Sequence, residues 1–275
     1  MEEQLYQACS CLYGKVEEVQ KLLQNEQLNI NWQNQKDYLR TPFFIACWYG
    51  HIDIVKLLLN DQRVDINKAE NDDETPFYIA CRNGKIEIVK LLLNDERIDI
   101  NKARNDGWSP FNIACHEKHI EIVKLLSNDN RVDINKADKY DQTPFYTVCK
   151  KGRIEIVKLL LNNKRIDINK ADKNGWTPFY TTCRFEKTEV VKYMLESGRE
   201  IDVNKKDSDE KSGLDWARER GNTDIVKLIE SFQKNPNETR AQLRRELKIG
   251  NFVNLIFEFL LFNFLTLTII IFVFF

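Results

Sequence analysis

The residues best suited to chemistry in this chain are its seven cysteines. Thiols can form disulfides, bind zinc or act as nucleophiles. Equivalent residues in stacked helices lie about 8 to 10 Å apart, however, and a disulfide needs Cα atoms within about 7 Å. Cys9 and Cys11 have no second pair that would complete a zinc site. The other five recur every 34 residues and are predicted to be buried and unpaired, with no metal and no cofactor: Cys47, Cys81, Cys115, Cys149 and Cys183.

Histidine makes no stronger case for catalysis. The three histidines are His51, His116 and His119, and none has an acid or a nucleophile at a motif spacing. The sequence also lacks a phosphate-binding glycine loop, a metalloprotease helix and a nucleophile elbow. We therefore expect no enzyme activity. An enzyme whose site has no recognisable motif stays a distant alternative.

The elements that must position these residues are repeated. The tripeptide Thr-Pro-Phe, or Ser-Pro-Phe in one case, starts at residues 41, 75, 109, 143 and 177, again at a step of 34. A fixed period of this size indicates short units that cannot bury an apolar face alone and must stack on their neighbours. The period therefore predicts a solenoid.

One unit, starting at Thr75, predicts two short helices and a turn. Thr75 can cap a helix whose first residue is Pro76, and Gly84 can end that helix in the left-handed conformation. A second helix is expected from about Ile86 to Leu93, where apolar residues follow helical spacing. The residues from Ile98 to Gly107 alternate briefly and end in turn residues, as a short hairpin does.

Two units have a different residue where the others carry this glycine. Lys118 and Glu186 occupy that position in the fourth and sixth units. A non-glycine residue in the left-handed conformation costs roughly 1 to 2 kcal/mol. We therefore expect local fraying in these two units.

The units resemble the ankyrin repeat, whose signature is Thr-Pro-Leu-His-x-Ala. Here the signature reads Thr-Pro-Phe-Tyr-x-Ala-Cys or Thr-Pro-Phe-Tyr-Thr-x-Cys, and Asp-Ile-Asn marks the hairpin. The resemblance implies an all-α ankyrin-repeat solenoid of about seven helix-turn-helix units with short β-hairpin turns. This domain would cover residues 1–233, with units starting near residues 5, 41, 75, 109, 143, 177 and 212.

The resemblance also implies a concave surface that binds another protein. In the ankyrin family, the hairpin tips and the ends of the first helices line this surface. Aromatic residues and arginine are the most frequent hot spots of protein interfaces. Trp108 and Trp176 have an alternative role, in which they pack over the adjacent hairpin. The implied partner-binding residues are Trp48, Tyr49, Arg82, Asn83, Trp108, His116, Tyr140, Lys150, Trp176 and Phe185.

The charge of the chain narrows the choice of partner. Its 41 basic and 42 acidic residues give a formal net charge of −1. This balance carries no signal for nucleic acid or for an acidic substrate. We expect a protein partner, no nucleic acid and no small-molecule substrate.

The C-terminal residues 251–275 differ in composition from the repeats. From Phe259 to Phe275, only Asn263, Thr266 and Thr268 are polar. A bilayer core needs about 20 apolar residues, and about 17 is near the lower limit. Residues 234–250 are expected to form a basic linker, whose positive charge favours the cytosolic side. Residues 251–275 are therefore predicted to be a hydrophobic transmembrane helix that attaches the protein to a membrane.

These features lead to one expected function and one main alternative. With no secretory signal, we expect a tail-anchored, non-enzymatic adaptor or scaffold on the cytosolic face of an internal membrane, with its repeats in the cytosol. The alternative is a soluble cytosolic ankyrin interaction module with an artefactual tail. AT-rich DNA translated out of frame or through an intron would also give a segment of Phe, Ile, Leu and Asn.

Overall fold

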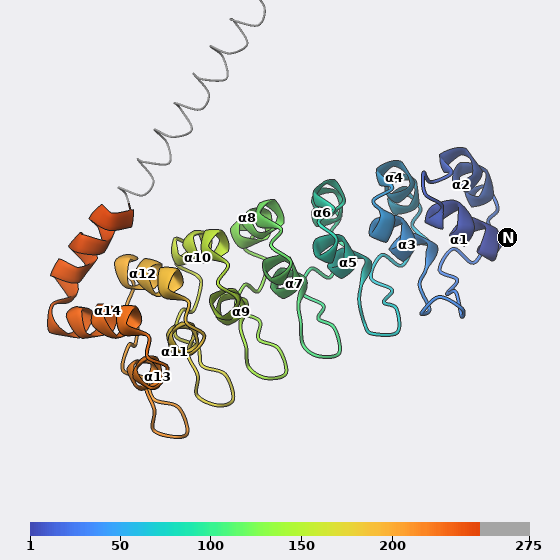
Figure 1. Ribbon diagram of the computed structural model, residues 1–275. Coiled ribbons are helices and arrows are strands. Elements are labelled where there is room, and N and C mark those ends of the chain that lie inside the picture. Colours follow the sequence, from blue (N-terminus) through green and yellow to red (C-terminus); the bar gives the residue numbers. More distant parts are fainter. Residues whose placement is uncertain (248–275) are drawn as a thin grey trace, which may run out of the picture.

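The computed structural model describes residues 1–247 of the chain. Seven helix pairs follow one another along a curved solenoid, and the loops between pairs project on one side (Figure 1). The first helices are α1 (Glu2–Ser10), α3 (Pro42–Tyr49), α5 (Pro76–Arg82), α7 (Pro110–His116), α9 (Pro144–Lys151), α11 (Pro178–Arg184) and α13 (Gly213–Glu219). The second helices are α2 (Val16–Leu23), α4 (Ile52–Asn60), α6 (Ile86–Leu93), α8 (Ile120–Asn128), α10 (Ile154–Leu161), α12 (Thr188–Glu196) and α14 (Thr223–Lys234). The predicted helical solenoid of about seven units is confirmed.

The start of each first helix follows from the Thr-Pro or Ser-Pro dipeptide. The hydroxyl of Thr75 accepts a hydrogen bond from the N–H of Tyr78 at 3.1 Å, and Pro76 is the first helical residue. The same cap recurs at Thr41, Ser109, Thr143 and Thr177. A proline at this position loses no helical hydrogen bond, because the first N–H groups have no partner within the helix.

The turn between the two helices of a unit requires the left-handed conformation. Gly84 has φ +69°, and a Cβ built there would lie 2.6 Å from Cε1 of His119. Lys118 and Glu186 adopt the same conformation, with φ values of 68° and 56°. The structure thus confirms the strained position of these two residues, while the fraying expected around them stays a prediction.

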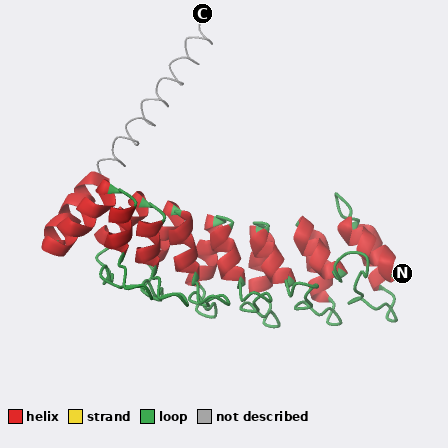
Figure 2. Cartoon of the chain, turned by 60° about the horizontal axis from the view of Figure 1, so that its bottom comes forward, coloured by secondary structure: helices red, strands yellow, loops and turns green. Residues whose placement is uncertain are grey.

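The loops between units contain no β-strand within residues 1–247, so the predicted β-hairpins are wrong at this level. Only two isolated bridges form, between Asn34 and Arg40 and between Lys206 and Ser212. Elsewhere the loops fold back as turns (Figure 2). In the loop that starts at Glu70, two backbone bonds close the turn, each 3.1 Å long. The N–H of Glu70 donates to the carbonyl of Glu74, and the N–H of Asp73 donates to the carbonyl of Glu70. The side chain of Glu70 accepts from the N–H of Glu74 at 3.3 Å and so takes the donor that a strand ladder would pair with the Glu70 carbonyl.

The core consists of apolar residues from both helices of every unit. The five cysteines that recur every 34 residues lie in it with no exposed surface and no disulfide, as predicted. First helices of neighbouring units pack side by side, and the second helices form a parallel outer row (Figure 1). Burial of this continuous apolar layer is the main source of stability for a stack of units.

Asparagine side chains connect one unit to the next. The amide of Asn101 donates to the carbonyl of Arg131 at 2.8 Å, and its oxygen accepts from the N–H of Asp133 at 2.9 Å. Both partners are backbone groups of the following unit. The same pair of bonds is made by Asn31, Asn67, Asn135 and Asn169. We call these five residues the asparagine clamps.

Residues 236–247, which lie in the predicted basic linker, are helical. Leu243 on this helix is 1% exposed, and Arg244 Nε lies 3.1 Å from Glu196 Oε1 of α12. Glu246 Oε1 pairs with Lys192 Nζ of the same helix at 2.7 Å. These residues therefore pack against α12 near the C-terminal end of the stack. The spacing of the buried Thr239 and Leu243, four residues apart, is that of one helix face.

The predicted transmembrane segment, Phe259 to Phe275, lies outside the described residues. Among residues 1–247, no helix combines the length and the apolar content that a membrane crossing requires.

Burial of the thiols predicts slow reaction with thiol reagents. Burial raises the pKa of Cys9 and of the five recurring cysteines well above the usual range, so the reactive thiolate is scarce at pH 8. Cys11 is the one half-buried thiol of the seven. We expect one rapidly reacting thiol per native chain in a titration with a chromogenic disulfide, and all seven after unfolding. Cys11→Ser should remove the rapid phase, and a second rapid thiol in that variant would contradict the burial.

Candidate functional site

Two positions contact each other in five of the seven units, along one side of the stack. The first precedes the capping Thr or Ser, and the second lies eight residues later, at the end of the first helix. These positions, together with the residue after each pair and the loop tips, form one surface. We call it the inner surface. Its contacting pairs are Arg40 with Trp48, Glu74 with Arg82, Trp108 with His116, Trp176 with Arg184, and Lys211 with Glu219.

The chemistry of these pairs changes from unit to unit while their place in the fold stays the same. The Arg40 guanidinium carbon lies 4.3 Å from the centroid of the Trp48 ring. The rings of Trp108 and His116 meet edge to face with centroids 5.0 Å apart. Lys211 Nζ and Glu219 Oε1 form an ion pair at 2.7 Å. The inner surface thus presents a row of different side chains on a constant frame.

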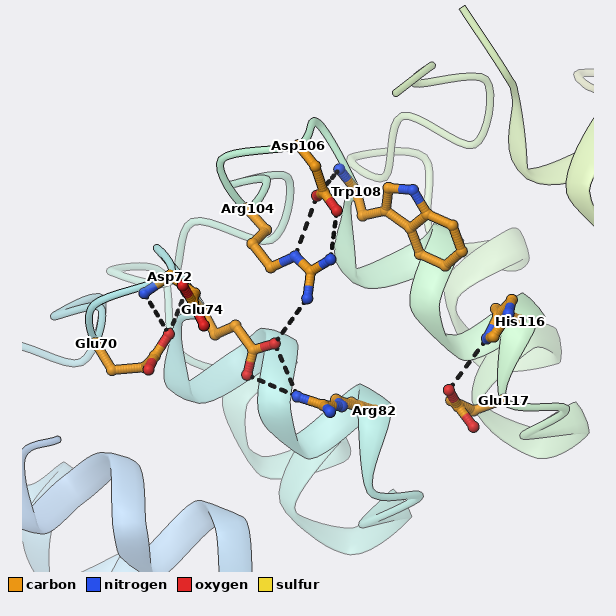
Figure 3. Close-up of polar contacts among 9 residues, drawn as sticks. All are labelled: Glu70, Asp72, Glu74, Arg82, Arg104, Asp106, Trp108, His116 and Glu117. Atoms are coloured by element: carbon orange, nitrogen blue, oxygen red, sulfur yellow. Dashed lines mark hydrogen bonds and ion pairs between the residues drawn. The ribbon is translucent and has the colours of Figure 1, made fainter. Parts of the chain in front are cut away.

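A network of four charged residues lies near the middle of this row (Figure 3). The Glu74 carboxylate, whose side chain is 5% exposed, accepts from Arg82 Nη1 at 2.8 and 3.0 Å and from Arg104 Nη1 at 3.3 Å. Arg104 Nε also donates to Asp106 Oδ1 at 3.1 Å. This hydrogen bond from Arg104 lowers the pKa of Asp106. The two guanidinium groups balance the two carboxylates, as a partly buried group of charges requires.

Arg104 occupies a position that is acidic in four other loops. There the carboxylate accepts from backbone N–H groups of its own loop; Asp172 Oδ1 accepts from Asn174 at 2.9 Å and from Trp176 at 3.0 Å. An arginine cannot accept hydrogen bonds, so Asp106 binds the N–H of Trp108 instead, at 3.2 Å. We call the four acidic residues the loop acids: Glu70, Asp138, Asp172 and Asp207.

The arginine also leaves a tyrosine without a partner. Tyr146 donates its hydroxyl to Asp172 Oδ2 at 3.1 Å, and Tyr180 donates in the same way to Asp207. Tyr78 holds the equivalent position next to Arg104, and its buried hydroxyl has no hydrogen-bond partner. Burial raises the pKa of Tyr78, so the hydroxyl stays protonated at neutral pH. The exchange of an acid for Arg104 thus gains the charged network and loses one buried hydrogen bond.

The unpartnered hydroxyl predicts opposite effects of one substitution at two equivalent positions. Tyr78→Phe removes a buried group that makes no hydrogen bond, so the free energy of unfolding should stay the same or rise by up to about 1 kcal/mol. Tyr180→Phe takes a donor from Asp207 and should lower it by about 1 to 3 kcal/mol. Urea unfolding followed by circular dichroism would measure both. A larger loss in Tyr78→Phe than in Tyr180→Phe would show that Tyr78 has a partner.

The predicted binding residues lie in series along the inner surface and do not gather in one pocket. Trp48, Arg82, Trp108, His116 and Trp176 are members of the contacting pairs. Three other predicted residues are exposed aromatic rings. Tyr49, Tyr140 and Phe185 are 44%, 56% and 38% exposed, and Lys150 Nζ lies 5.6 Å from the centroid of the Phe185 ring.

Three of the predicted residues have contacts within the stack. Asn83 Nδ2 donates to the carbonyl of Trp48 at 3.2 Å and thereby joins two units. Trp176 stacks on Tyr180 of its own first helix, with ring centroids 5.6 Å apart, and Trp108 packs against the core. Both tryptophans are half-buried, so each has a packing role and still contributes to the surface.

Glu74, Arg104 and Arg184 belong to this surface but were not among the predicted binding residues. A signal for Arg104 was present in the sequence, because it breaks the acidic pattern of residues 70, 138 and 172. The eight-residue offset between the two positions of a pair was a further signal. Within residues 1–247, no group of three or more His, Cys, Asp or Glu side chains is placed to hold a metal ion.

Comparison with known proteins agrees with this architecture. The family model described as ankyrin repeats (3 copies) matches residues 5–104, 62–138, 97–172, 130–207 and 164–240, which together span most of the chain. The chain belongs to the ankyrin repeat family. Among solved structures, the ankyrin repeat domain of Bcl-3, a member of the IkappaB protein family, superposes with a TM-score of 0.72 at 21% sequence identity. The match covers 82% of this chain and 97% of that domain.

No curated protein sequence matches the chain. At 21% identity, the likeness to Bcl-3 shows a shared fold and nothing further about binding. The family assignment agrees with the resemblance found in the repeated motifs. Ankyrin repeats are protein–protein interaction modules, and the inner surface is the part of this chain that varies between units.

Proposed function

We propose that this ankyrin protein is a non-enzymatic adaptor that binds another protein through its inner surface. The observation that supports the proposal is the constant frame of the contacting pairs with variable chemistry. Equivalent positions carry a salt bridge in Glu74–Arg82, an aromatic pair in Trp108–His116 and a cation–π pair in Trp176–Arg184. Packing and capping residues, in contrast, recur in nearly every unit.

Exposed aromatic residues support the same proposal. Tyr49, Tyr140 and Phe185 place large rings at the surface, where burial of apolar area by a partner would be favourable. Aromatic and arginine side chains supply most of the binding free energy in protein interfaces. The inner surface carries both kinds of residue over several units, so the proposed interface is extended and engages more than one unit.

Substitution of the exposed rings tests this proposal. Tyr49→Ala combined with Phe185→Ala should weaken binding of a partner isolated with the full chain by more than tenfold, because each loss at a hot spot amounts to about 2 kcal/mol. Binding would be measured by surface plasmon resonance. The control is Lys90→Ala combined with Lys124→Ala, which changes two exposed residues of the outer helices α6 and α8. Equal binding by all three proteins would place the interface elsewhere.

A second proposal, membrane attachment, is supported by the sequence alone. The apolar run from Phe259 to Phe275 approaches the length of a membrane span. In this proposal the repeats lie on the cytosolic face of an internal membrane. The alternative is a soluble cytoplasmic module, and the adaptor proposal holds in either case.

Fractionation would decide between attachment and a soluble module. Because residues 236–247 contact α12 and α14, the truncated variant should end at Leu247, so that these contacts are retained. Each chain would carry an N-terminal tag for detection. We expect the full chain to stay in the membrane pellet after carbonate extraction and the truncated chain to be soluble. If both are soluble, the apolar segment is not an anchor.

A further inference from the structure

The basic residues of the inner surface fall into two groups. In the third and fourth units, Arg82 and Arg104 are neutralised by Glu74 and Asp106. In the seventh unit, Lys211 pairs with Glu219 at 2.7 Å. The fifth and sixth units differ. There Lys150, Lys151 and Arg184 have no carboxylate within 4.0 Å among the residues that the structure describes, and we call these three residues the unpaired cations.

Arg184 lies against two aromatic rings. Its guanidinium carbon lies 4.0 Å from the centroid of Trp176 and 4.3 Å from that of Trp216, which belongs to the following unit. Rings contact the flat faces of a guanidinium, whereas its N–H donors point outward in the plane of the group. This arrangement orients the donors and leaves their edge suited to a carboxylate, which accepts two parallel hydrogen bonds.

An apolar ring lies beside the cations. Phe185 follows Arg184 in the chain and is 38% exposed, and Lys150 Nζ lies 5.6 Å from the centroid of its ring. Lys151, the next residue of α9, is exposed. The surface therefore combines three positive charges with one open apolar contact over two neighbouring first helices.

Two buried carboxylates of these units are already bound internally. Asp138 and Asp172 are 7% and 6% exposed, and both accept hydrogen bonds from backbone N–H groups of their own loops. Asp172 also accepts from the Tyr146 hydroxyl. Two exposed acids of this region, Asp141 and Glu186, lie at a loop tip and at the turn between α11 and α12. None of these four neutralises an unpaired cation by direct contact.

We propose that the inner surface of the fifth and sixth units binds an acidic segment of a partner protein, with a carboxylate on Arg184 and an apolar side chain on Phe185. The proposal rests on the adaptor function and specifies the chemistry of the partner. Charge complementarity supports it, because uncompensated cations attract and orient an acidic partner.

A nucleic acid fits this surface less well than an acidic peptide. Recognition of a phosphate backbone needs a basic stripe along the binding face. Here Lys150, Lys151 and Arg184 lie on two units, and the charges of Arg82 and Lys211 on either side of them are paired. The chain as a whole has a formal net charge of −1. The acidic peptide is therefore the ligand that the surface favours.

Peptide selection on the full chain tests the inference. A random peptide library should yield binders with an excess of Asp and Glu next to an aromatic or aliphatic residue. Affinity would be measured by fluorescence anisotropy with the selected peptides carrying a label. Arg184→Gln, and separately Lys150→Gln combined with Lys151→Gln, should weaken binding about tenfold or more, because hydrogen bonds to charged groups contribute about 1.5 to 3 kcal/mol. Added salt should weaken binding to the unmodified chain more than to the variants.

Two further variants separate binding from folding. Arg184→Lys keeps the charge but loses the two-pronged hydrogen bonding, so its affinity should lie between those of the unmodified chain and Arg184→Gln. Arg218→Gln is the matched control. Arg218 lies on the neighbouring helix α13, is exposed and already pairs with Glu230 at 2.8 Å, so peptide binding should change less than about twofold. Urea midpoints of all variants would be compared, because Arg184 packs between two rings.

Several outcomes would overturn the inference. Selected peptides without an acidic excess would do so, as would acidic peptides whose affinity is unchanged in Arg184→Gln. If the variant Tyr49→Ala combined with Phe185→Ala still loses binding of these peptides, the adaptor proposal stands. Only the proposal of an acidic partner is then wrong. In another outcome, labelled polyuridine binds more tightly than every selected peptide and loses this binding in Arg184→Gln. That result would show that the surface binds nucleic acid.

Discussion

The asparagine clamp joins each unit to the next through two bonds to backbone groups. In the middle of the stack, Asn101 binds the carbonyl of Arg131 and the N–H of Asp133. Because both partners are backbone groups, the clamp fixes the register between units whatever side chains the neighbouring positions carry. Hydrogen bonds alone contribute little net stability, and burial of the apolar layer supplies most of it. The clamp sets how the apolar residues of one unit align with those of the next. The cysteines that recur every 34 residues therefore stack on one another.

A fixed register allows the inner surface to vary. The two positions of each contacting pair meet in the same way along the stack, so a change from Glu74–Arg82 to Trp176–Arg184 alters the chemistry and leaves the frame intact. The constant frame also limits how many contacts a substitution removes. Arg104 replaces a loop acid, and the loss is confined to one loop and one buried hydroxyl, that of Tyr78. The gain is a charged network that neutralises the inner surface at that point.

Two regions of the inner surface therefore differ in electrostatics. Near Glu74 the charges compensate one another, whereas Lys150, Lys151 and Arg184 remain without a carboxylate partner among residues 1–247. The solenoid then ends in a helix formed by residues 236–247, which contacts α12 and α14 and on which Leu243 is buried. A stack of units needs such an end, since the outer face of its last unit would otherwise expose apolar surface.

The sequence alone determined the features that depend on short separations along the chain. The period, the Thr-Pro caps, the bounds of α6, the buried cysteines and the left-handed Lys118 and Glu186 all follow from local spacing and backbone preference. The helix at residues 236–247 was missed because its apolar pattern lies outside the repeat and covers few residues.

Only the tertiary structure decided which side chains meet across units. Arg104 reaches Glu74, 30 residues away, and Arg184 lies between rings from two units. The loop acids bind N–H groups that a hairpin would have used, which removed the predicted strands. Such contacts depend on rotamers and on the exact placement of neighbouring loops, and the linear spacing of residues does not specify either. The sequence therefore determines the frame of this protein, while its stacked units determine the charges that the inner surface presents.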